Sequence, residues 1–101
     1  MKIWVDDVRK KPKEYDGQFR SVYDTISFIE FCIRKNVKIE LISLDHDAGC
    51  YADEGGDYIK ILDWMIENNF RCPVHLHTMN PVGRENMRRL MKRYEIEEVI
   101  L

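Results

Sequence analysis

The chain has 101 residues, so we expect a single domain that spans residues 1–101. Hydrophobic residues make up 45% of it, which argues against disorder, and a formal net charge of −2 gives no overall attraction for nucleic acid. The three cysteines are odd in number and form no CxxC pair, so a disulfide scaffold is not expected. The chain also has neither a secretory leader nor an apolar run of about 20 residues, and we therefore expect a cytoplasmic protein without a membrane partner.

The first half of the chain predicts strands on either side of one helix. Lys2 to Val5 is a short apolar strand, and Phe19 to Tyr23 is a weaker strand candidate. Asp24 can cap a helix that ends near Asn36. The buried stripe of this helix has residues spaced by three and four, namely Ile26, Phe28, Ile29, Cys32 and Ile33. Ile39 to Leu44, rich in β-branched and leucine residues, is the clearest strand.

The second half predicts two further helices and two strands. After the glycine-rich loop Ala48 to Gly56, Asp57 can cap a second helix. Val74 to Thr78 is a strand, and Asn80-Pro81 opens a third helix in the favoured order of cap and proline. The residues that these helices turn inward are Ile59, Leu62, Met65 and Ile66 in the second and Met87, Leu90 and Met91 in the third. Glu98 to Leu101 is a last short strand.

Strands and helices therefore alternate along the chain. This alternation predicts a three-layer α/β domain with a parallel sheet of about five strands. Because crossovers are right-handed, few topologies remain, and we expect the flavodoxin-like strand order 2-1-3-4-5. That order places the first, third and fourth strands side by side, so their carboxyl ends meet at one edge of the sheet, where ligands of such folds bind.

Acidic side chains follow two of these strand ends. Asp6 and Asp7 come directly after the first strand, and Asp45 follows the third. Three carboxylates this close repel one another unless a cation separates them, and ligand sets of oxygen atoms favour Mg²⁺ or Mn²⁺ over zinc. We therefore predict a metal site here. In the alternative, Asp7 caps the turn or pairs with Arg9, and only two acids converge.

The tripeptide Asp45-His46-Asp47 adds further candidates. In an extended backbone Asp45 and Asp47 share one face while His46 points to the other, so all three serve the site only if the chain bends after Asp45. With that bend, Asp47 is a further metal ligand and His46 a catalytic residue. Without it, Asp47 is a turn acid that holds the following loop.

The fourth strand ends in histidine and polar residues. His75 lies deeper in the strand, where a structural histidine is commoner, while His77 lies next to the strand end and suits general acid/base catalysis. Thr78 and Asn80 can donate hydrogen bonds to a phosphoryl oxygen.

Two arginines could hold a phosphate at the same rim. Arg84 lies in the first turn of the third helix, where free amide groups favour anions, and Arg9 lies on the loop after the first strand. The alternative is that Asn80 only caps the helix and Arg84 is solvated.

Aromatic and basic residues offer weaker candidates for nucleic-acid contact. Trp4 and Trp64 lie within a strand and a helix, which favours core packing, whereas Tyr51 and Tyr58 flank the loop and are freer to meet a nucleobase. The third helix has a basic face, which either is solvated or contacts an RNA backbone: Arg84, Arg88, Arg89, Lys92 and Arg93.

Four segments of the chain resemble one known family. The acidic residues after the first and third strands and the threonine after the fourth are similar to those of response-regulator receiver domains. The closer resemblance is to a divergent branch, the cyclic-phosphate processing receiver domains, and it covers essentially the whole chain. The segments that carry it are Trp4-Val5-Asp6-Asp7-Val8-Arg9, Ser43-Leu44-Asp45-His46-Asp47, Gly56-Asp57-Tyr58 and His77-Thr78-Met79-Asn80-Pro81-Val82-Gly83-Arg84-Glu85-Asn86-Met87.

The resemblance implies a receiver-like fold and a role on cyclic phosphate ends, notably those of RNA, during repair or processing. This chain departs from signalling receivers in two ways, because it has no lysine just after the last strand and no final helix. Both departures argue against phosphorylation-driven switching at Asp45.

We therefore hypothesise a metal-dependent phosphoesterase that hydrolyses a 2′,3′-cyclic phosphate at an RNA 3′ end or on a nucleotide. Asp6, Asp7 and Asp45 would hold Mg²⁺ or Mn²⁺, with Asp45 central to catalysis, while His77 and His46 move protons. Two alternatives are a receiver-type signalling module phosphorylated on Asp45 and a module that binds phosphate ends without cleaving them.

Overall fold

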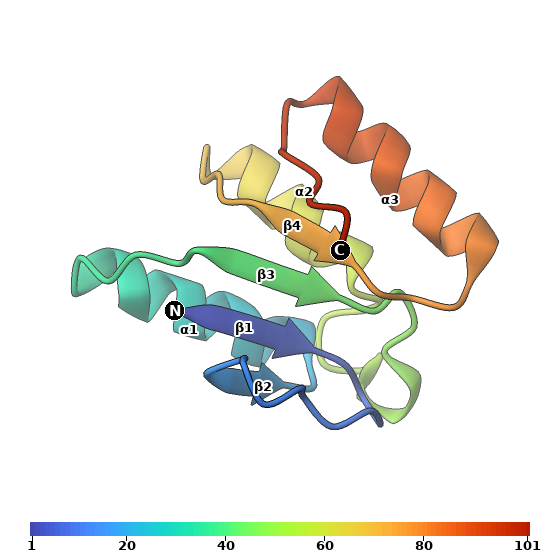
Figure 1. Ribbon diagram of the computed structural model, residues 1–101, viewed down its shortest axis with the longest axis horizontal. Coiled ribbons are helices and arrows are strands. Elements are labelled where there is room, and N and C mark those ends of the chain that lie inside the picture. Colours follow the sequence, from blue (N-terminus) through green and yellow to red (C-terminus); the bar gives the residue numbers. More distant parts are fainter.

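Four parallel strands form the sheet of this computed structural model, which describes residues 1–101 (Figure 1). The strands are β1 (Lys2–Val5), β2 (Gly17–Phe19), β3 (Leu41–Leu44) and β4 (Val74–Leu76), and their order across the sheet is β2-β1-β3-β4. The helices are α1 (Val22–Arg34), α2 (Ile59–Glu67) and α3 (Pro81–Arg93), with a short 3₁₀ turn, η1, at Gly49–Tyr51. The predicted flavodoxin-like receiver fold is confirmed, with four strands in place of about five.

The predicted fifth strand, Glu98 to Leu101, is reduced to a single parallel bridge between Val74 and Glu98. The segment still runs along β4, because the backbone N–H of Val74 donates to Glu97 and the N–H of Val99 donates to Val74. Two bonds are too few for a strand.

Two helix starts differ from those that the sequence predicted. The hydroxyl of Ser21 accepts a hydrogen bond from the backbone N–H of Asp24 at 3.0 Å, so Ser21 caps α1, and the second strand ends before it at Phe19. Asp57 does not cap α2, since Tyr58 occupies that position and the Asp57 carboxylate instead accepts from the N–H of Ala48 at 2.9 Å. Asp57 therefore fastens the loop after β3.

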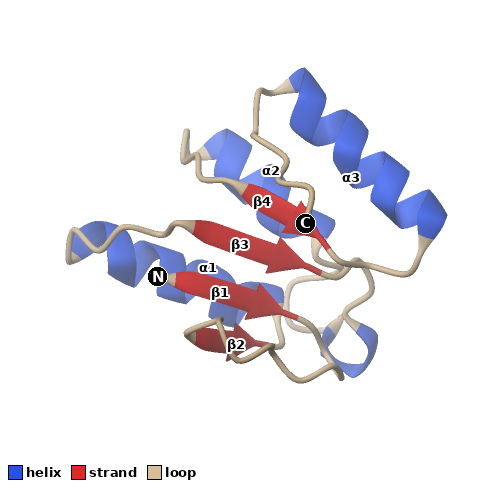
Figure 2. Cartoon of the chain, viewed as in Figure 1, coloured by secondary structure: helices blue, strands red, loops and turns tan.

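All three helices pack on one face of the sheet. Their buried side chains join alternate strand residues in a single cluster of 19 buried residues, among them Ile3, Ile42, Val74, Ile29, Met65 and Met87. Figure 2 shows α1 and α2 behind the strands. The opposite face carries no helix. Trp4 and Leu41 on that face are covered by Tyr15 and Val99 from non-helical segments, so loop and C-terminal chain cover this face in place of the second helical layer of a three-layer fold.

The register of the sheet aligns the carboxyl ends of the three neighbouring strands β1, β3 and β4. Val5 of β1 pairs with Leu44 of β3, which in turn pairs with Leu76 of β4. The strand arrows in Figure 2 accordingly point to the same edge. The residue that follows each strand therefore emerges at that edge, as the sequence predicted. None of the helices has the length and apolar character needed to cross a membrane.

An ion pair fastens the C-terminal segment to α3. The guanidinium of Arg88 donates to both carboxylate oxygens of Glu98, at 2.8 and 2.7 Å. The hydrogen bond from Arg88 lowers the pKa of Glu98 below its ordinary value. A lowered folded-state pKa means that the ionised form contributes stability above the unfolded-state pKa, and that this contribution is lost as the pH falls through the folded value.

We predict that Glu98→Gln lowers the free energy of unfolding at pH 7 by about 1 kcal/mol or less, the scale of a partly exposed ion pair. Urea denaturation should show the difference from wild type shrinking below pH 4.5, the ordinary glutamate value, and vanishing at lower pH. The exposed neighbour Glu97 provides the control, since Glu97→Gln removes the same charge without the ion pair. Equal effects of the two substitutions would contradict the assignment.

Candidate functional site

Three carboxylates meet at the edge where the strands end. One oxygen from each of Asp6, Asp7 and Asp45 lies within 4.8 Å of the others. The backbone continues the sheet at this point, because the N–H of Asp45 donates to Val5 at 2.9 Å and the N–H of His77 donates to Leu44 at 2.9 Å. The predicted convergence of positions 6, 45 and 77 is therefore confirmed, while the roles of these residues remain predictions.

The carboxylate of Asp6 is fully buried and fully hydrogen-bonded. Its Oδ1 accepts from the backbone N–H groups of Val8 and Arg9 at 3.0 and 2.8 Å, and its Oδ2 lies 2.9 Å from His77 Nε2 and 3.2 Å from Arg9 Nε. Burial by itself raises the pKa of Asp6, but the hydrogen bonds from Arg9, Val8 and His77 outweigh it and lower the pKa. Asp6, and not Asp7, is thus the acid that holds the turn and pairs with Arg9.

Of the three carboxylates, that of Asp7 has the least favourable surroundings for a negative charge. No cationic side chain pairs with it, since Arg9 faces Asp6 and Asp45 and Arg20 donates to the backbone carbonyl of Asp7. Burial and then repulsion from Asp6 and Asp45 raise the pKa of Asp7. A cation bound by the three acids would remove this repulsion, and their all-oxygen donor set is the kind that Mg²⁺ and Mn²⁺ prefer. The residues present therefore fit such an ion.

Arg9 already places a positive charge beside the acids. Its Nη2 lies 3.8 Å from Asp45 Oδ1, and its side chain is 43% exposed. The guanidinium therefore contacts two of the carboxylates and faces solvent on its other side.

His77 is held by hydrogen bonds on both ring nitrogens. Nε2 lies 2.9 Å from Asp6 Oδ2, Nδ1 lies 2.8 Å from Ser43 Oγ, and the ring stacks on Trp4 with the centroids 3.7 Å apart. Because the carboxylate of Asp6 only accepts, we assign the proton to Nε2, so that Nδ1 accepts from the hydroxyl of Ser43. Burial lowers the pKa of His77, which favours this neutral form. The geometry is that of a residue that positions Asp6.

His46 and Asp47 form a second group of ligand-type side chains together with Asp57. His46 Nδ1 lies 2.9 Å from Asp47 Oδ1, while Asp47 Oδ2 accepts from Asn80 Nδ2 at 3.3 Å. The hydrogen bond from His46 lowers the pKa of Asp47. The chain does bend after Asp45, but the bend places Asp47 in this group and not in that of the first three acids. His46 Nε2 has no hydrogen-bond partner in the protein.

The first turn of α3 supports the ring of His46. A Cβ atom added at Gly83 would overlap this ring, lying 2.6 Å from Cδ2. Asn80 caps the helix as predicted, because its Oδ1 accepts from the N–H of Gly83 at 3.0 Å, and Pro81 has no N–H. The N–H of Val82 is left without a protein acceptor at this helix start.

The predicted phosphate contacts Thr78 and Arg84 lie close together near this helix start. Thr78 is buried, and its Oγ1 accepts from the N–H of Asn80 at 3.1 Å. The Arg84 guanidinium donates to the backbone carbonyl of Thr78. Both side chains therefore hold the turn between β4 and α3.

The comparisons with known proteins bear on the whole arrangement. A family model described as the cyclic-phosphate processing receiver domain matches residues 1–93. The chain belongs to this family. Neither the curated proteins nor the solved structures contain a significant match.

Sequence reasoning gave no role in this receiver domain's site to three residues, although each lies in a segment that carries the family resemblance. Ser43, Gly83 and Asp57 touch His77, His46 and the loop after β3, respectively. A glycine in the first turn of a helix is an unfavourable choice for helix stability, and that signal could have identified Gly83. Ser43 is a polar residue inside an apolar strand, and it is the first residue of one of the segments that carry the family resemblance.

The aromatic predictions had mixed outcomes. Tyr58 is fully buried and donates to the carbonyl of Arg20 at 2.6 Å, so the prediction that it meets a nucleobase is wrong. Trp4 is buried as expected. His75 is structural, since its Nδ1 lies 2.8 Å from the carbonyl of Val99.

We predict that Asp7→Asn stabilises the metal-free receiver domain by on the order of 1 kcal/mol or less, because it removes a charge that two neighbours repel. Thermal melts should also show that Mg²⁺ or Mn²⁺ raises the Tm of the wild type and has little effect on the variant, since ligand binding to the folded state adds stability. Glu30→Gln, which neutralises an exposed acid on α1, is the matched control. A variant that still gains stability from the ion would contradict the ligand set.

We also predict that Gly83→Ala displaces the ring of His46 while the fold is retained. Alanine favours a helix by about 1 kcal/mol over glycine, but its methyl group would occupy the place of the imidazole. NMR of the histidine side chains should show a change at His46 and none at His75. Asn86→Ala, on an exposed part of the same helix, should leave both signals in place.

Proposed function

We propose that this receiver domain hydrolyses cyclic phosphate ends with the help of a divalent cation, the substrate being a 2′,3′-cyclic phosphate on an RNA 3′ end or a nucleotide. The proposal rests on one juxtaposition: the three acids Asp6, Asp7 and Asp45 lie at the same edge as His46, whose ring is oriented by Asp47 and keeps one nitrogen free. The description of the family supports a role in cyclic-phosphate processing.

The carboxylates of Asp6, Asp7 and Asp45 would hold the cation. When bound, Mg²⁺ or Mn²⁺ would withdraw charge from the phosphoryl oxygens and orient the substrate. Arg9 would give up its contact with Asp45 and lie free to pair with a phosphate, because both cations are attracted to the same oxygens. His77 would keep Asp6 in place through the hydrogen bond to Oδ2.

His46 would carry the proton. With Nδ1–H donating to Asp47, the lone pair of Nε2 is free to take a proton from an attacking water. The water oxygen then bonds to phosphorus, the bond to one ribose oxygen breaks, and that oxygen takes a proton from solvent. Asp47 stabilises the imidazolium that forms, as the orienting acid does in other histidine-dependent hydrolases. The free N–H of Val82 is a further donor for the phosphoryl group.

The direct test is to incubate the protein with an oligonucleotide ending in a 2′,3′-cyclic phosphate, with Mg²⁺ or Mn²⁺, and to follow the ends by mass spectrometry. We predict conversion to a phosphomonoester, loss of turnover in Asp45→Asn, and a loss of about 10²–10⁴-fold in His46→Gln, the range for general acid/base catalysis. His75→Gln, at a histidine outside the site, should retain activity. Unchanged ends with every metal and substrate would reject the proposal.

His77→Gln separates the two histidines. If His77 positions Asp6, the substitution should raise the cation concentration needed for half-maximal rate more than it lowers kcat at saturating cation. A loss of kcat equal to that of His46→Gln would instead assign proton transfer to His77.

A phosphoryl adduct on Asp45 from acetyl phosphate, without turnover of cyclic ends, would select the signalling module, and binding without turnover would select the binding module.

A further inference from the structure

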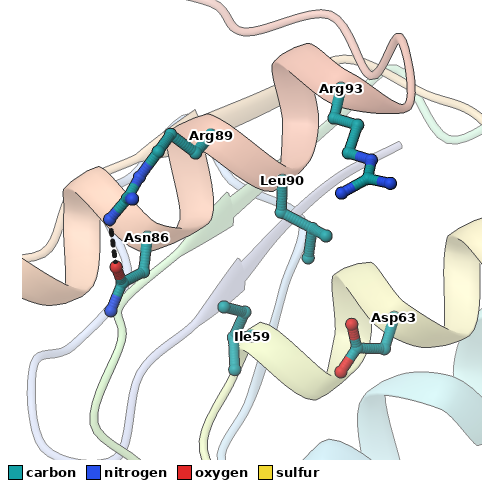
Figure 3. A pocket seen from close by; sticks show the side chains of 6 residues that line it. All are labelled: Ile59, Asp63, Asn86, Arg89, Leu90 and Arg93. Carbon is teal, nitrogen blue, oxygen red and sulfur yellow. Dashed lines mark hydrogen bonds between the residues drawn. The ribbon is translucent and has the colours of Figure 1, made fainter.

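The outer surface of the helical layer has a groove between α2 and α3. It has a volume of about 340 Å³ over Ile59 and Leu90 and continues into a second hollow of about 230 Å³ beside Ile66 and Tyr94. Figure 3 shows Leu90 and Ile59 pointing toward one another at the floor of the groove. The two parts share Asp63 and Leu90, so they form one groove, which we call the α2–α3 groove. No residue of the proposed active site lines it.

Opposite charges line the two walls of the α2–α3 groove without pairing across it. On the α3 wall, Arg89 donates only to Asn86 and Arg93 lies over the ring of Tyr94, and neither pairs with an acid. On the α2 wall, Asp63 has one distant contact with Lys60 at 3.8 Å, and Glu67 has no ion pair. Figure 3 shows Arg93 on α3 and Asp63 on α2, beside the apolar pair Leu90 and Ile59.

This charge pattern selects the kind of occupant. A nucleic-acid backbone would be attracted by Arg89 and Arg93 and repelled by Asp63 and Glu67 on the opposite wall of the same groove. The matching surface is an apolar stripe with a basic and an acidic border. The α2–α3 groove of a second copy is such a surface. When two copies meet about a two-fold axis that runs along the groove, the basic border of each faces the acidic border of the other, so every contact forms twice.

We propose that the α2–α3 groove is the interface of a homodimer in which Arg89 and Arg93 of each copy pair with Asp63 and Glu67 of the other across the apolar residues Ile59 and Leu90. The four helices of this interface form one layer between two sheets. The proposed active sites remain open to solvent, because their acids lie at the strand ends and not on the helical surface. The dimer is therefore independent of the proposed function.

Sedimentation equilibrium between about 10 µM and 1 mM, the range of weak specific association, tests the dimer. The wild type is expected to shift from monomer to dimer. The basic-wall variant, Arg89→Glu with Arg93→Glu, and the acidic-wall variant, Asp63→Lys with Glu67→Lys, should each dimerise at least about tenfold more weakly, since like charges then face each other. Lys92→Glu with Lys38→Glu changes the charge equally away from the groove and should dimerise as the wild type does.

Mixing the two weakened variants is the decisive arm. In a mixed dimer the introduced glutamates of the basic-wall variant face the introduced lysines of the acidic-wall variant, and the unchanged acids of the first face the unchanged arginines of the second. All contacts are then again between opposite charges, and dimers should return to the wild-type level. Circular dichroism of each variant confirms that these exposed substitutions leave the fold intact. A monomeric wild type, a wild-type dimer that the wall variants do not weaken, or a mixture that stays monomeric would each overturn the proposal.

Discussion

The hydrogen bonds to the buried carboxylate of Asp6 join the parts of the site. They come from the turn after β1, from the guanidinium of Arg9 and from His77 beyond the end of β4. Since an unpaired buried charge costs several kcal/mol, removing any of these donors would lower the stability of the folded protein. The same contacts fix the turn that presents Asp7 and the ring of His77. Asp6 thereby sets the position of its neighbours while its own charge is satisfied.

The three acids therefore differ in how well hydrogen bonds and nearby cations compensate their negative charges. Asp6 has its donors and Asp45 accepts from the N–H of His46 at 2.8 Å, but Asp7 receives no cation from the protein. Gly49, with a φ of 56°, leaves room for the Asp7 carboxylate, since any side chain there would overlap its Oδ2. A charge held in an unfavourable place by a close-fitting backbone supports the proposal of a cation site, because functional sites commonly cost stability.

The fold separates its two candidate functions in space. Polar chemistry gathers at the edge where the parallel strands end, because backbone direction brings those residues together. The outer face of the helices carries the charged α2–α3 groove, because each helix buries one stripe in the core and leaves the other exposed. The remaining face of the sheet, with Trp4 and Leu41, is closed by loop and C-terminal chain.

The sequence by itself determined the alternation of strands and helices, and with it the strand order and the meeting of positions 6, 45 and 77, because right-handed crossovers leave few topologies. It also determined the Asn80 cap and the structural role of His75, which depend on residues close to them in the sequence. Only the tertiary structure decided which of Asp6 and Asp7 is buried, that Tyr58 is a core residue, and that Gly83 supports His46. The hydrogen bond from His77 to Asp6 joins residues 71 positions apart. Such contacts depend on how far each side chain reaches once the backbone is closed, and no local pattern encodes that distance.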